Sequence, residues 1–156
     1  MTKRFESILR TIEHLGDPVG SVSSDDLLRL AGLLASGLRA EQIGRLCELL
    51  RHENAYARIV ALRAAARLKA WENGAVLEAT IGCISDQDAR VRIAAAVVIA
   101  GSGYAASRVL DALRLAAGDR KPNDTFDADD LTQQACVEAA RAIERLTTKR
   151  ASPQPH

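Results

Sequence analysis

The chain has 156 residues, of which 47% are hydrophobic, 26% are charged and only 3% are aromatic. Alanine and leucine, with 28 and 19 residues, supply most of the hydrophobic share, which favours packed helices over sheets. The formal net charge of +1 lacks the basic excess typical of duplex-binding domains. No apolar run approaches the roughly 18 residues that a membrane span needs. We therefore expect an all-α protein with no membrane contact.

The first 15 residues mix charged side chains with apolar ones and contain no signal-peptide core. Cys47, Cys83 and Cys136 are odd in number and far apart, so their spacing suits neither a disulfide framework nor a zinc site. Each of them falls on an apolar helix face, where a buried, reduced thiol is expected. The sequence thus predicts a cytoplasmic protein, and we expect no metal or other cofactor.

The hydrophobic pattern predicts a series of helical hairpins that repeat along the chain. Ile59 in one hairpin aligns with Ile93 in the next at an offset of 34, and their neighbours follow the same register. The last hairpin needs an offset of 41, and its seven extra residues fit the polar stretch 118–130. Residues 1–147 are thus expected to form one domain, with hairpins at about 5–36, 39–70, 74–102 and 104–147.

Helix ends are marked by polar side chains of the capping type. Residues 23–26, Ser-Ser-Asp-Asp, suit the start of the second helix of the first hairpin. Asp127, Asp129 and Asp130 suit the positive end of the last helix, because carboxylates stabilise a helix N-terminus. Pro153 and Pro155 predict that residues 148–156 form a disordered tail.

Residues 86–103 combine an acidic turn, a small apolar residue before arginine, and an alanine-rich helix that ends in glycine. This stretch resembles the second-helix signature of HEAT-like repeats, an armadillo-type family. The resemblance implies a right-handed α-solenoid of about four hairpins. It also implies a ladder in which turn aspartates bond to helix arginines, formed here by Arg58, Asp86, Asp88 and Arg92. Ser24 and Gln133 at the matching positions would leave that ladder incomplete at both ends.

The residues give little support to an enzymatic function. His52-Glu53 resembles the His-Glu motif of the deoxyhypusine hydroxylases, but one pair cannot hold a di-iron centre. The acidic stretch 118–130 lacks the central glycine and terminal glutamate of a calcium loop. HEAT-like repeats also resemble phycobilin lyase subunits, and the scarcity of aromatic residues and of paired histidines argues against a bound tetrapyrrole. We therefore expect a protein that is not an enzyme, with the lyase subunit kept as an alternative.

Nucleic-acid binding is a second alternative, because some HEAT-like solenoids are DNA glycosylases. Trp71 is the only tryptophan, and no aromatic run is available for base stacking. Arginine outnumbers lysine by 17 to 4, which genome composition explains as well as phosphate binding does. We do not expect nucleic acid as the main partner.

The unusual surface is the side of the second helices that lies opposite the predicted core face. In the two central hairpins it presents Ile59, Leu62, Ile93 and Val97, where a solvated helix would carry polar side chains. An apolar strip flanked by arginine is typical of a protein-contact surface, although ordinary packing in a tightly curved array would also explain it. We expect the concave helices to bind another protein, or a second copy of this chain in a homodimer. The predicted contact residues are Leu28, Arg29, Ile59, Leu62, Arg63, Ile93, Val97, Val137, Glu138 and Arg141.

Overall fold

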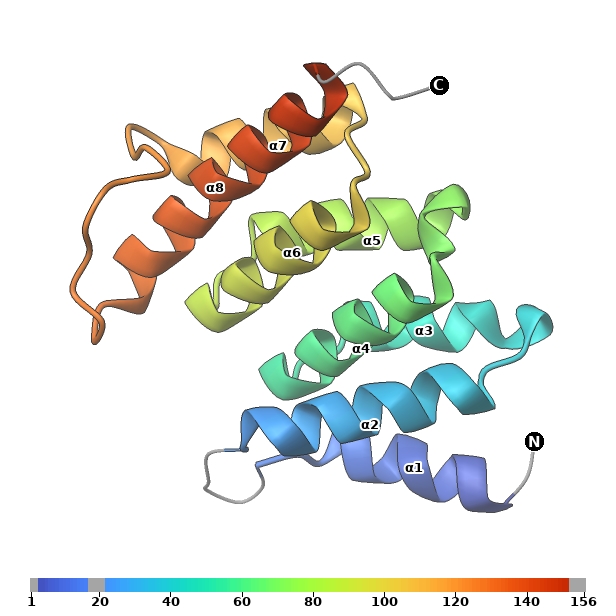
Figure 1. The fold of residues 1–156 in the computed structure, drawn as a ribbon. Helices are drawn as coiled ribbons and strands as arrows, with labels where there is room; N and C mark the ends of the chain where they lie inside the picture. The colour runs from blue at the N-terminus through green and yellow to red at the C-terminus, as the bar shows by residue number, and fades with distance from the viewer. Residues whose placement is uncertain (1–2, 17–21, 152–156) are drawn as a thin grey trace. The chain divides into compact units, whose positions relative to one another are not determined.

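The computed structural model describes residues 3–16 and 22–151, with side chains as far as residue 148 (Figure 1). Within these ranges all the regular secondary structure is helical, and no strand occurs. The expectation of an all-α protein is therefore confirmed. The elements in chain order are α1 (Lys3–Glu13), α2 (Ser24–Gly37), the 3-10 helix η1 (Ala40–Gln42), α3 (Ile43–Leu50), α4 (Ala55–Leu68), the 3-10 helix η2 (Ala70–Glu72), α5 (Gly74–Ile84), α6 (Ala89–Ser102), α7 (Ser107–Ala117) and α8 (Leu131–Ala151).

The chain divides into two compact units, Met1–Thr80 and Ile81–His156, and the boundary falls within α5. In the first unit, α4 packs against α1, α2 and α3. Figure 1 shows α2 and α4 side by side and running in the same direction. Apolar residues recur on one face of α1, where Phe5, Leu9 and Ile12 are buried, because helical spacing of this kind places them on a single stripe.

In the second unit, α8 packs against both α6 and α7. Most of its buried residues are small, among them Ala135, Ala139 and Ala142. Small side chains allow two neighbouring helices to approach α8 on different sides. Leu113 of α7 and Val91 of α6 are fully buried.

Capping residues begin several of these helices in the way that the sequence predicts. The hydroxyl of Ser23 accepts a hydrogen bond from the Asp26 amide at 3.2 Å, which confirms the predicted start of α2. Asn54 and Asp88 hold the corresponding places before α4 and α6, accepting from the amides of Tyr56 and Arg90 at 2.9 Å. These side chains satisfy amides that have no partner inside the helix.

The last helix is longer than the sequence pattern indicates. It continues to Ala151, so residues 148–151, which were predicted to belong to a disordered tail, are helical. The remainder of that predicted tail, 152–156, lies outside the described residues. No helix in the described part of the chain combines the length and apolarity needed to cross a bilayer.

Candidate protein-contact surfaces

The ten predicted contact residues fall into two groups in the structure. Three of them, Ile59, Leu62 and Val137, are buried, with 5%, 0% and 0% of their surface exposed. The other seven are exposed or partly exposed: Leu28, Arg29, Arg63, Ile93, Val97, Glu138 and Arg141. The contiguous exposed strip that the sequence predicts is therefore interrupted at its three buried positions.

Ile59 and Leu62 are buried because α4 has almost no free side. It packs against α1, α2 and α3, and every residue from Ala57 to Leu62 is buried. A helix buried over consecutive positions has no solvent-facing stripe for these side chains to occupy. Ile59 and Leu62 thus belong to the core, and the prediction that they line an exposed strip is not met.

Val137 is buried for a similar reason, since α8 packs against two helices. Its neighbours Glu138 and Arg141 form an ion pair at 3.0 Å. Arg141 also donates from Nε to the carbonyl oxygen of Pro122 at 3.1 Å, and its guanidinium lies 5.7 Å from the centre of the Phe126 ring. Arg141 therefore has a structural role, because it holds the loop 118–130 against α8.

The acidic residues of this loop act as capping groups, as the sequence indicates. Asp130 accepts hydrogen bonds from the amides of Thr132 and Gln133, both at 3.1 Å, at the start of α8. Asp127 accepts from the amide of Asp129 at 3.0 Å. Its own amide donates to the Gln133 side chain at 3.2 Å. The loop is held by these bonds, which favours capping over calcium binding.

α6 is the helix whose exposed side remains apolar. The ridge Arg90, Ile93, Val97 and Gly101 follows helical spacing, and beyond Arg90 it carries no polar side chain. Val97 is 50% exposed, and Ile93 is partly exposed. A surface helix normally carries polar residues on such a side, so this ridge is a candidate contact surface.

The predicted arginine ladder takes a local form in each unit. Nη1 of Arg58 donates to the carbonyl oxygens of His52 and Glu53, at 2.6 and 3.1 Å. Nη1 of Arg92 donates to those of Asp86 and Gln87, at 2.6 and 3.2 Å.

The turns before these two arginines also match each other. A side chain two residues upstream accepts from the N-cap amide: Nδ1 of His52 accepts from Asn54, and Oδ1 of Asp86 accepts from Asp88. In the second unit Asp88 also pairs with Arg90 at 2.7 Å. His52 is thus occupied in a turn. No group of three or more metal-ligating side chains forms among the residues that the structure describes.

A second group of arginines lacks such acceptors. Arg63 and Arg67 lie one turn apart on α4, and neither forms an ion pair with any described residue. Nη1 of Arg63 is buried without a hydrogen-bond partner, and burial lowers the pKa of this guanidinium. By contrast, the pKa of the exposed Arg45 is raised by its hydrogen bond and ion pair with Glu48, at 3.1 Å.

Arg67 rests against α2 at a glycine. A Cβ placed on Gly32 would lie 3.0 Å from Nη1 of Arg67, so the absent side chain makes room for the guanidinium. The sequence pattern predicts Arg63 as a contact residue but gives no role to Arg67 or Gly32. A glycine in the middle of an apolar helix was the available signal, because such a position weakens the helix unless something lies close to it.

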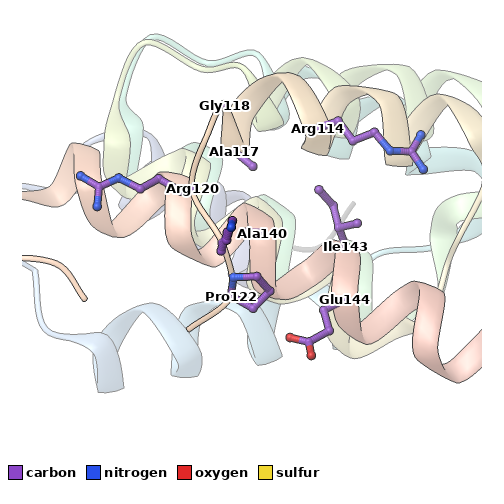
Figure 2. A pocket seen from close by; sticks show the side chains of 9 residues that line it. Arg114, Ala117, Gly118, Arg120, Pro122, Ala140, Ile143 and Glu144 are labelled. Carbon is purple, nitrogen blue, oxygen red and sulfur yellow. The ribbon is translucent and has the colours of Figure 1, made fainter. Parts of the chain in front are cut away.

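A hollow in the second unit lies where the loop 118–130 leaves α7 and crosses α8. It has a volume of about 270 Å³. Figure 2 shows Ala117, Pro122, Ala140 and Ile143 around it. The guanidinium groups of Arg114 and Arg120 extend away from the hollow in opposite directions (Figure 2). Pockets for small-molecule ligands measure roughly 300 to 1,000 Å³, so this one falls just below that range.

The chain was compared with known proteins at three levels. No protein-family model, curated protein or solved structure matches it. The candidate surfaces therefore rest on the chain's own geometry, and the apolar ridge of α6 and the arginine pair of α4 are two candidates among the described residues.

Proposed function

We propose that this protein is a non-enzymatic module that binds another protein, and that the ridge Ile93, Val97 and Gly101 of α6 forms part of the contact. The observation that carries the proposal is the 50% exposure of Val97 on a helix side without polar residues. A partner that covers apolar surface of this kind gains a binding free energy of about 25 cal/mol for each Å² removed from water. The partner is a different protein or a second copy of this chain.

We further propose that the helices form about four HEAT-like hairpins in a right-handed solenoid. Two observations support this arrangement. The hydrophobic pattern repeats at an offset of 34, and the same arginine-to-carbonyl contact occurs at Arg58 and at Arg92, which are separated by that offset. Stacked hairpins of this family commonly use their second helices as a binding surface, and α6 would be one of these.

The test is affinity capture from a native lysate with the wild-type chain and two variants, read by mass spectrometry. Val97→Asp places a charge on the α6 ridge. Leu115→Asp is the matched control, because Leu115 on α7 is 86% exposed and the substitution is chemically the same. Circular dichroism of each variant shows whether helical content is retained.

The proposal expects a protein that wild type and Leu115→Asp retain and that a folded Val97→Asp loses. Sedimentation of the purified chain tests whether it forms a homodimer. If it does, Val97→Asp should weaken the association of the two copies. If Val97→Asp retains every bound protein and the same oligomeric state, the α6 ridge is not the contact surface.

A further inference from the structure

From the arginine pair on α4 we infer a site for acidic side chains of a partner protein. The site comprises Arg63, Arg67 and the neighbouring face of α2, with Gly32 and Leu28. This inference rests on the proposed function, since it names the chemistry of a partner that the module would bind. It concerns the first unit, whereas the α6 ridge lies in the second.

Geometry places both guanidinium groups on one face. Arg63 precedes Arg67 by four residues, so the two side chains leave α4 on the same side. Arg67 lies against Gly32 of α2, and α2 runs beside α4 in the same direction (Figure 1). One turn earlier on α2 is Leu28, so Arg63 lies at about its level. The site thus combines two cations with Leu28, an apolar side chain that is 44% exposed.

The electrostatic state of Arg63 favours an anionic ligand. Its Nη1 has left water without gaining a hydrogen bond, which is a costly arrangement for a charged donor. A carboxylate that arrives at the partly exposed remainder of the side chain offsets this cost through charge attraction, without bonding to the buried Nη1. Arginine pairs well with carboxylates, because its planar group can donate two parallel hydrogen bonds.

Two features favour an acidic protein segment over nucleic acid. The neighbouring part of α2 carries Asp25 and Asp26, and Asp26 lies 4.0 Å from Arg29, so the positive charge is confined to the arginine pair. A phosphate backbone needs a continuous basic track, whereas a segment with two carboxylates needs only that pair. Leu28 adds an apolar contact that a phosphate backbone would not use. A partner helix with two carboxylates one turn apart and an apolar residue between them matches all three side chains.

The experiment measures binding of a fluorescein-labelled helical peptide of that design by fluorescence polarisation, at physiological ionic strength. A peptide with glutamine in place of glutamate reports contacts that do not need charge. Labelled duplex DNA is the third probe. Each is titrated with the wild-type chain, Arg63→Gln, Arg67→Gln and Gly32→Ala.

Arg45→Gln is the matched control. It removes one positive charge from the same unit, and Arg45 is exposed and already paired with Glu48. Gly32→Ala keeps the charge unchanged but brings a methyl group to 3.0 Å from Nη1 of Arg67, so the guanidinium must shift by a few tenths of an ångström.

We expect the acidic peptide to bind and the glutamine peptide to bind far more weakly. Arg63→Gln and Arg67→Gln should each weaken binding at least about tenfold, as expected for loss of a charge-assisted hydrogen bond. Gly32→Ala should weaken it by less than either arginine substitution, and Arg45→Gln should leave it within about twofold.

Three results would overturn the inference: an equal loss with Arg45→Gln, binding of duplex DNA in place of the acidic peptide, or no binding of any probe. None of them affects the α6 ridge, whose test uses Val97 and Leu115. Capture that depends on Val97, together with an arginine pair that binds no acidic peptide, would leave the proposed function standing and remove only this site.

Discussion

Replacement of Gly37 by alanine tests the closest approach between α1 and α2. A Cβ on Gly37 would lie 2.5 Å from Cδ2 of Phe5 and 2.8 Å from Cε2, which is closer than van der Waals contact allows. The Phe5 ring is only 4% exposed, so it has little room to move away. Overpacking of this kind costs about 1–3 kcal/mol, whereas alanine in place of glycine in a helix returns at most about 1 kcal/mol. We expect Gly37→Ala to lower the free energy of unfolding by about 1–2 kcal/mol.

Gly44→Ala is the matched control for this prediction. Gly44 lies in α3 of the same unit, and no atom lies within 4 Å of a Cβ placed on it. The substitution therefore brings only the helix-propensity gain, and it should stabilise the unit by about 0.5–1 kcal/mol. Gly→Ala substitution should therefore lower the free energy of unfolding at position 37 and raise it at position 44.

Urea unfolding followed by tryptophan fluorescence measures both variants. Trp71 is the only tryptophan of the chain, and it is buried in the same unit as Gly37 and Gly44. Phe5→Leu completes the test, because a smaller side chain should cost less stability in the Gly37→Ala background than in wild type. If Gly37→Ala is as stable as wild type, the contact between Phe5 and Gly37 is not as close as the structure indicates. The same conclusion follows if the free-energy changes of Gly37→Ala and Phe5→Leu are additive.

Three further substitutions separate core, capping and loop roles. Leu62→Ala should cost about 2–5 kcal/mol because Leu62 is fully buried, and a loss below about 1 kcal/mol in urea unfolding would contradict its place in the core. Asp130→Ala should cost about 1 kcal/mol and speed amide exchange in the first turn of α8, whereas unchanged exchange would mean that its bonds to Thr132 and Gln133 do not hold the helix start. Arg141→Gln should leave the melting temperature nearly unchanged but speed proteolysis within 118–130, because it removes contacts to the loop; equal cleavage rates would show that the loop does not depend on this arginine.

The features that sequence predicted well depend on residues close together in the chain. Ser23 caps α2 through an amide three residues away, and Asp130 caps α8 in the same manner. Such bonds need only a polar side chain and a helix start, both of which the sequence displays. The turn roles of His52 and Asp86 are local for the same reason.

Exposure was harder to predict, because it depends on which helices surround a residue. The helical pattern places Ile59 and Leu62 opposite the expected core face, but α4 has neighbours on several sides and buries both. Val97 obeys the same pattern on α6, and there the expectation of an exposed apolar residue agrees with the structure. The pattern alone does not distinguish these cases, since the number of neighbouring helices is a tertiary property.

The arginines show what the structure adds to the sequence. Of 17 arginines, the sequence pattern selects Arg29, Arg63 and Arg141 as contact residues but does not separate these three from one another. The structure separates them by their acceptors: Arg58 and Arg92 bond to turn carbonyls, and Arg141 holds a loop. Arg58 and Arg63 each have a buried nitrogen without a partner, Nε and Nη1 respectively, but only Arg58 also bonds to carbonyl oxygens through another nitrogen. A folded chain gains nothing from that arrangement by itself, since an unpaired buried donor is destabilising. A carboxylate near the partly exposed Arg63 offsets part of this cost by charge attraction, which is why Arg63, rather than the better-bonded arginines, marks the site.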